Sequence, residues 1–385
     1  MNDSVMRLTH KKQNRNIGID LLRLVSMFYV VIFHILGYGG VCGSANDVLS
    51  FAICWFLKTF VYCAVNIYAL ISGYVGYNDK EKSYKYSRYI YMWLQVVFWG
   101  VLITTYYFVT KPGSVGLKHY ILSVLPVIGN QYWYFTAYTG LFFIIPFLNK
   151  FIRFCSKRFL TGAVVTIFVI FSCFSTVAGV YSDPFYMNKG FSFLWITFVY
   201  IIGAYIKKYD IPKAVNTKIA ILLGCALLFI TYFSKLGIRY LTISLFGHSF
   251  REDFLLVYTS PTILGIAIVY LIIFSKIKIS RSKKIIEFLA PSAFGVYLFH
   301  MQHLFLDNDF AFHFSFIADS PLWLIPLSIL WYALIIFIIG LLIDKVRSYI
   351  FKFIRVNKFT ERIELVTRRL FNKFYDKIQS VIDDK

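Results

Sequence analysis

Three ionisable side chains lie inside the first long apolar segment of the chain, which runs from Ile17 to Tyr38. Asp20 stands three residues before Arg23, and His34 follows Arg23 by eleven residues, close to three turns of an α-helix. The three groups therefore share one face of the predicted helix. Because a charge in the hydrocarbon is costly, such residues normally face a protein interior or a water-filled cavity and indicate a working site.

The depths of these side chains suggest two different tasks. At about 1.5 Å per residue from a boundary at Ile17, Arg23 lies about 9 Å deep and His34 about 25 Å deep. A guanidinium binds phosphate or carboxylate through two parallel hydrogen bonds, and a histidine suits general-base catalysis. The structural alternatives are an Asp20–Arg23 ion pair that only stabilises a helix bundle, and a histidine that only lies at the membrane interface.

The composition predicts an integral membrane protein. The chain has 385 residues, of which 58% are hydrophobic and only 15% are charged, whereas soluble domains have about 25% charged residues. The apolar segments are continuous and helix-length, which favours an all-α protein over a β-barrel with short alternating segments. The net charge of +21 follows the membrane topology and forms no single face for nucleic acid.

Ten transmembrane helices are predicted from the apolar segments, at residues 17–38, 49–76, 89–109, 131–149, 160–180, 191–206, 219–236, 253–275, 288–306 and 322–344. If the chain crosses the membrane at each of these segments, the parts on the side of the N-terminus hold 32 Lys and Arg. The parts on the other side hold 6, with Lys235 counted among the 6. Positive charge collects on the cytoplasmic side of membrane proteins, so both termini are expected to be cytoplasmic.

Two parts of the chain differ in character. Residues 1–345 are predicted to form the membrane domain, and residues 346–385 a basic cytoplasmic tail with apolar residues at helical intervals, as in an amphipathic helix on the inner leaflet. The six cysteines show no paired spacing of the kind that binds metals, so no metal site is expected.

The chain resembles the membrane acyltransferase-3 family, the multi-pass O-acyltransferases of bacterial surface polysaccharides. The resemblance rests on six motifs in the family's order, which are D-x-x-R with R-x10-H at Asp20, Arg23 and His34, the segment Asn66–Tyr74 that ends in Ser-Gly-Tyr, Arg88 before the third span, the aromatic segment Tyr132–Tyr138, the Ser-Pro segment Tyr258–Ile268, and the segment Ser292–His300. Many relatives have proline where this chain has Asn66 and Gln95, which puts the local helix geometry in question.

The resemblance implies a reaction across the bacterial plasma membrane. The donor would be a cytoplasmic acyl-CoA, usually acetyl-CoA, with no permanently bound cofactor, and the acceptor a hydroxyl of a surface glycan or of its lipid-linked precursor. Arg23, Arg88 and Lys85 would hold the phosphates of the donor. His34 lies about 16 Å from Arg23 along the helix axis, comparable to an extended phosphopantetheine arm, and would act as general base or carry the acyl group itself.

Further residues are candidates for the same site. His300, with Tyr297 beside it, is expected to come close to His34 by depth, although a packing role is equally compatible with its position. Trp133 and Tyr134 could stack on a sugar ring, but the ordinary aromatic belt of membrane proteins explains them better. A carboxylate is expected to orient His34, and the candidates at the outer ends of spans are Asp307, Asp309, Glu252 and Asp253.

A transporter or flippase is the alternative from another class of protein. Ten spans and an intramembrane polar stripe would also suit it, but the sequence shows no internal repeat and no matched pair of broken helices. Binding of acyl-CoA would separate the two, since a transporter of glycan has no reason to recognise this donor.

Overall fold

The computed structural model describes residues 15–80 and 84–383, and all the secondary structure in these ranges is helical. Seven stretches in the described part are long and apolar enough to cross a membrane. They are α1 with α2 (Ile17–Leu36, Val41–Ser44), α3 with α4 (Val48–Val61, Ala64–Gly76), α5 (Ser87–Thr110), α7 (Trp133–Phe154), α8 with η1 and α9 (Lys157–Thr166, Ile167–Phe174, Ser175–Ala178), α12 (Thr217–Phe246) and α17 (Leu324–Phe353). The predicted all-α, multi-pass architecture is confirmed.

The other three predicted spans are shorter or divided. They correspond to α10 (Phe193–Lys208), α13 (Pro261–Lys276), and the sequence of α14 (Lys283–Leu289), η3 (Ala290–Ser292) and α15 (Ala293–His300). A helix of 16 residues, such as α10 or α13, is about 24 Å long and falls short of a hydrocarbon core of about 30 Å. The count of ten spans and the orientation of the termini therefore stay predictions.

Shorter helices occupy the connections. They are α6 (Leu117–Val124), η2 (Asn188–Gly190), α11 (Ile211–Ala214), α16 (His303–Phe305), η4 (Leu306–Phe310) and η5 (Ser315–Asp319). The long final helix is α18 (Val356–Asp383).

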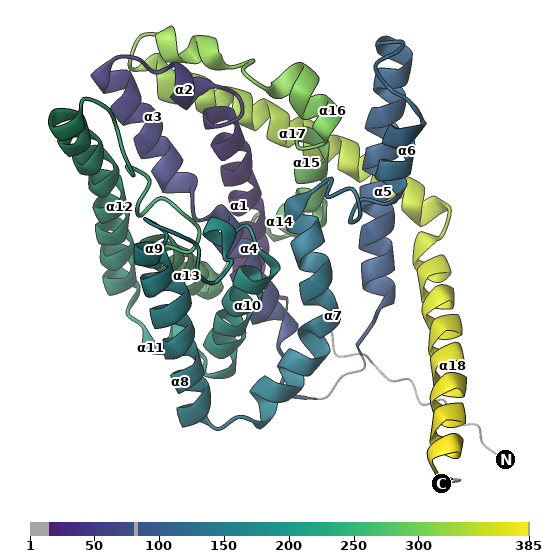
Figure 1. Ribbon diagram of the computed structural model, residues 1–385. Coiled ribbons are helices and arrows are strands. Elements are labelled where there is room, and N and C mark those ends of the chain that lie inside the picture. The colour runs from purple at the N-terminus through teal and green to yellow at the C-terminus, as the bar shows by residue number, and fades with distance from the viewer. Residues whose placement is uncertain (1–14, 81–83, 384–385) are drawn as a thin grey trace.

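Helix α1 lies in the middle of the bundle and contacts α3, α4, α13, α15 and α17 (Figure 1). In its apolar window 67% of the residues are buried by protein, compared with 17% in α12. The helix that carries Asp20, Arg23 and His34 is therefore shielded from lipid, which lowers the cost of its polar groups. We refer below to the Arg23 end and the His34 end of the bundle.

Local interactions fix where α1 begins and how its neighbours approach. The Asn16 side-chain oxygen accepts a hydrogen bond from the Ile19 amide, and its side-chain nitrogen donates to the Ser275 carbonyl at the end of α13 (2.8 Å). Helices α4 and α10 touch through glycine. A Cβ at Gly73 would lie 2.0 Å from the Tyr200 carbonyl oxygen of α10, so the glycine of the Ser-Gly-Tyr motif permits close helix packing.

A buried ion pair ties α17 to α5. The Arg347 guanidinium donates two hydrogen bonds to the Asp344 carboxylate, at 3.0 and 2.8 Å, and both residues are almost fully buried. Gln95 and Trp99 of α5 also donate to this carboxylate, at 3.0 and 3.2 Å. Because the pair is satisfied inside the protein, α17 continues past residue 345 as far as Phe353.

The predicted tail helix is α18, and it packs against α5. The Glu364 carboxylate accepts hydrogen bonds from the Ser87 amide at the start of α5 (2.9 Å) and from Arg368. Arg368 also donates to the Tyr84 carbonyl. Although burial raises the pKa of Glu364, the hydrogen bonds from Ser87 and Arg368 lower it to about 2.

Replacement of Glu364 by glutamine is expected to loosen the contact of α18 with α5. The loss of one charge-assisted contact corresponds to about 1 kcal/mol, or about a fivefold higher population of the open form. Since the pKa is lowered on docking, the parent should also lose stabilisation of this contact as the pH falls from about 4.5 towards 2. Hydrogen exchange of the amides at the start of α18 measures both effects, and the exposed Glu361→Gln is the matched control. Equal exchange in the two variants would contradict this role of Glu364.

Candidate active site

His34 and His300 form a buried hydrogen-bonded pair near the C-terminal ends of α1 and α15. Nδ1 of His34 lies 2.9 Å from Nε2 of His300, and Nδ1 of His300 lies 2.6 Å from the Val296 carbonyl oxygen one helical turn earlier. The exposed fractions are 7% for His34 and 0% for His300. Two segments 266 residues apart in the sequence thus place two histidines in contact.

This geometry determines the tautomers of the two neutral rings. A carbonyl oxygen only accepts, so Nδ1 of His300 carries the proton that it donates to Val296. Nε2 of His300 is then the acceptor, and Nδ1 of His34 donates to it. The proton-free nitrogen of His34 is therefore Nε2, which makes no hydrogen bond within the described part of the chain. His300 thus holds the His34 base in a fixed orientation, as the orienting group of a catalytic triad holds its histidine.

The expectation that a carboxylate orients His34 is wrong for the described residues. Glu252 and Asp253 bind Lys235, with oxygen–nitrogen distances of 2.7 Å each, and Asp309 accepts a hydrogen bond from the Tyr107 hydroxyl. A buried imidazole backed by a backbone carbonyl needs no ionised partner, so no further charge has to be desolvated.

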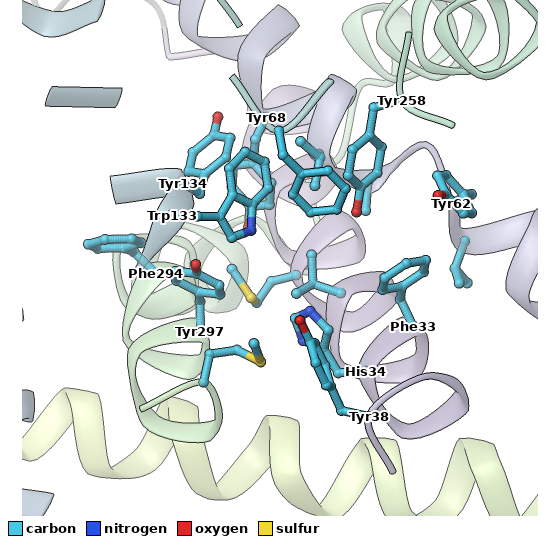
Figure 2. Close-up of a pocket in the computed structure, with 17 residues that line it drawn as sticks. Phe33, His34, Tyr38, Tyr62, Tyr68, Trp133, Tyr134, Tyr258, Phe294 and Tyr297 are labelled. Atoms are coloured by element: carbon cyan, nitrogen blue, oxygen red, sulfur yellow. The ribbon is translucent and has the colours of Figure 1, made fainter. Parts of the chain in front are cut away.

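His34 lines an aromatic cavity of about 80 Å³ (Figure 2). The break between α3 and α4 contributes one wall, the start of α7 another, and α15 a third. The lining residues are Met27, Val30, Phe33, His34, Tyr38, Val61, Tyr62, Ala64, Val65, Tyr68, Trp133, Tyr134, Phe191, Tyr258, Phe294, Tyr297 and Met301. Trp133, Tyr134 and Tyr297, three of the residues singled out in the sequence, thus lie around the same cavity as His34.

Two tyrosines give this largely apolar cavity polar groups. The Tyr134 hydroxyl is buried and has no hydrogen-bond partner within the described residues. The Tyr297 hydroxyl lies beside the backbone amide of Tyr134, in the first turn of α7. A helix N-terminus has unpaired amides, so the first amides of α7 can donate to an oxygen that enters the cavity.

Arg23 lies one helical turn before Met27, on the N-terminal side of the α1 residues that line the cavity. Its guanidinium forms an ion pair with Asp20 (2.8 Å), and Asp20 also pairs with Arg15. The Arg23 side chain keeps 31% of its surface exposed, so it can still reach an anion. Tyr68 lines the cavity and donates from its hydroxyl to the Arg23 carbonyl (2.8 Å), which joins the two regions.

Arg88 and Lys85 lie at the start of α5, at the Arg23 end, and both side chains are exposed. The structure does not bring either of them into contact with Arg23. Tyr138 of α7 lies within electrostatic range of both Arg23 and Arg88, so the two arginines approach one region from different helices. No group of three or more possible metal ligands occurs in the described ranges.

The sequence interpretation missed several residues of the cavity. Met27 and Tyr38 lie at helical spacing from His34, so the period of α1 could have identified them. Phe191 and Tyr258 come from connections between helices, and no sequence pattern indicated that these rings lie against Trp133. The distance between ring centroids is 4.7 Å for Phe191 and 6.3 Å for Tyr258.

A bundle of helices long enough to cross a membrane encloses a buried histidine pair beside an aromatic cavity. Comparison with known families identifies this bundle, because residues 16–345 match the family model described as an acyltransferase domain. The chain belongs to this membrane acyltransferase-3 family and is a multi-pass membrane acyltransferase. No curated protein and no solved structure matches the chain.

Proposed function

We propose that this acyltransferase moves an acetyl group from acetyl-CoA, bound at the Arg23 end, to a hydroxyl of a cell-envelope glycan or its lipid-linked precursor at the His34 end. The observation that carries the proposal is the chain of hydrogen bonds from Val296 through His300 to His34, which leaves one basic nitrogen at the cavity. By the positive-inside rule, the Arg23 end faces the cytoplasm of a bacterial plasma membrane.

In the proposed reaction His34 acts as general base. Nε2 takes the proton of the acceptor hydroxyl while the oxygen attacks the thioester carbonyl carbon. In this proposal the negative oxygen of the tetrahedral intermediate lies near the first amides of α7. The carbon–sulfur bond then breaks, the ester forms, and the coenzyme A thiolate takes the proton from the His34 imidazolium.

The placement of Arg23 supports a donor that enters from the opposite end. Eleven residues separate it from His34, or about 16 Å along the axis, so phosphates held by Arg23, with Arg88 and Lys85 at the mouth, would leave the thioester near His34. Since one water needs about 10–15 Å³, a cavity of about 80 Å³ has room for a short acyl group. This size favours acetyl over long acyl chains.

The direct test is binding of acetyl-CoA to the purified protein, together with mass spectrometry of surface glycan from cells that naturally carry the chain. Deletion of the chain should remove an acetyl-sized mass increment. Arg23→Gln should raise the Kd for acetyl-CoA about tenfold or more, since a hydrogen bond to a charged group is worth about 1.5–3 kcal/mol.

Arg158→Gln is the matched control, because this exposed arginine at the start of α8 lies at the same end and outside the site. It should bind the donor like the parent. A parent protein that binds no acetyl-CoA and leaves the glycan unchanged would refute the proposal and favour a transport function.

A further inference from the structure

A second, polar groove lies at the His34 end of the bundle. It has a volume of about 500 Å³, within the usual range of about 300–1,000 Å³ for ligand sites. Its walls come from the connection between α9 and α10 and from the connection between α12 and α13. Charged and polar side chains line it, among them Asp183, Asn188, Lys189, Arg251 and Glu252.

Only one layer of chain separates this groove from the catalytic cavity. Val257 and Thr259 line the groove, while Tyr258 between them lines the cavity. The Tyr258 amide donates to the Lys189 carbonyl (3.1 Å), so the two connections form one wall. At Gly190, which has φ of 97°, a Cβ would lie 2.5 Å from that of Tyr258. The absence of a side chain there keeps the wall thin.

Part of the groove is held rigidly and part is available to a ligand. The Asp183 carboxylate accepts hydrogen bonds from the Met187 amide (2.9 Å) and from the Asn188 amide. Glu252 binds Lys235 and Arg239, at 2.7 and 3.0 Å.

The groups available to a ligand come from the two connections and from α9. Lys189 is exposed and forms no ion pair within the described residues. Arg251 is exposed, contacts the Phe250 ring (5.1 Å) and donates a long hydrogen bond to the Gly179 carbonyl (3.4 Å). Thr176 also lines the groove, and its buried hydroxyl has no partner in the described ranges. The groove therefore offers donors and acceptors together.

We propose that this groove binds the saccharide of the acceptor and presents one of its hydroxyls to His34. The inference rests on the proposed function. The cavity around His34 is largely apolar and, at about 80 Å³, too small to enclose a sugar ring together with the groups that would hydrogen-bond to it. A hydroxyl-rich chain needs many hydrogen-bonding groups, and the mixed polar lining of the groove supplies them. The wall formed by Tyr258 and Lys189 then has to open for the reacting hydroxyl to reach His34.

Variants that fill or neutralise the groove test this assignment. Ser182→Trp adds bulk at an exposed lining position. Lys189→Asn removes a charge at a residue with φ of 54°, a conformation that asparagine tolerates well. Leu117→Trp and Lys118→Asn in α6 make the same changes at exposed positions of the same end and serve as controls.

Each variant replaces the natural copy in cells that carry the chain, at equal membrane levels. Ser182→Trp should lower acetyl groups on the surface glycan at least tenfold and Lys189→Asn severalfold, while both purified proteins bind acetyl-CoA like the parent. The α6 variants should match the parent in both measurements.

The two possible failures give different results. If the groove variants acetylate the glycan like the parent, the acceptor binds elsewhere and the inference is refuted, while the proposed function stands. If the parent itself neither binds acetyl-CoA nor changes the glycan, the proposed function and the inference fall together.

Discussion

Replacement of His34 by alanine is expected to lower the rate of acyl transfer by a factor of about 10²–10⁴, the contribution typical of a positioned general base. Nε2 of His34 is the proton-free nitrogen at the cavity, and within the described residues no other histidine lines it. The rate of acetyl transfer in membranes, with the amount of protein matched, measures the effect. Binding of acetyl-CoA should be unchanged, because in the proposed mechanism the donor phosphates bind at the Arg23 end.

The His300 variants separate a positioning role from a structural one. His300→Gln keeps an oxygen that can accept from Nδ1 of His34, whereas His300→Leu removes every acceptor. We expect a larger fall in kcat for leucine than for glutamine, with the KM for acetyl-CoA unchanged in both. An equal loss in the two variants, with loss of folded protein, would mean that His300 only packs. A normal rate in His34→Ala would refute the mechanism as a whole.

The helical period of the first apolar segment was enough to predict that its three ionisable residues share one face of α1. Asp20, Arg23 and His34 share a face because their spacing matches about 3.6 residues per turn, and the Asp20–Arg23 pair is present. Depth alone also suggested that His300 approaches His34, since residues at similar depths on neighbouring helices can come close together. Their contact at 2.9 Å confirms the proximity, while the catalytic roles stay predictions.

The partner of His300 could not be predicted from residue types. Every residue has a carbonyl, so nothing in the sequence distinguishes Val296 as the acceptor, and a carboxylate was the natural expectation for orienting a histidine. The places of Phe191 and Tyr258 at the cavity could not be predicted either. Both residues belong to connections whose paths depend on tertiary contacts, such as the hydrogen bond from Asn66 to the Tyr258 carbonyl (2.8 Å).

The departures from the family pattern now have a physical account. Asn66 also accepts a hydrogen bond from the Trp195 indole (2.9 Å), and Gln95 donates to Asp344. Both polar residues therefore connect neighbouring helices. The charge pattern that gave ten spans is insensitive to helix length, so it did not distinguish the short, enclosed α10 and α13 from the helices that face lipid.

Replacement of Asp344 by alanine is the second change expected to have a large effect. It leaves the Arg347 guanidinium buried, 3% exposed, without its carboxylate, which costs about 3–5 kcal/mol when one partner of a buried pair is removed. Gly295→Ala should act on the same contact, because its Cβ would lie 2.2 Å from the Asp344 carboxylate carbon. The fraction of detergent-extracted protein that elutes as a single folded species on heating measures both losses. Asp210→Ala, which breaks an exposed pair with Lys213, is the control.

The double variant Asp344→Leu with Arg347→Met shows whether the charge pair itself is needed. Replacing a buried ion pair by apolar residues of similar size is often neutral, so the double variant should recover much of the stability lost in Asp344→Ala. Gln95 and Trp99 would still lose their acceptor, at about 1 kcal/mol each. Because Gly295 lies five residues before His300 on the segment that positions it, recovered stability should restore transfer as well. A stable double variant without activity would instead mean that the charges of α17 act on the site, and that their role is more than the packing of α15.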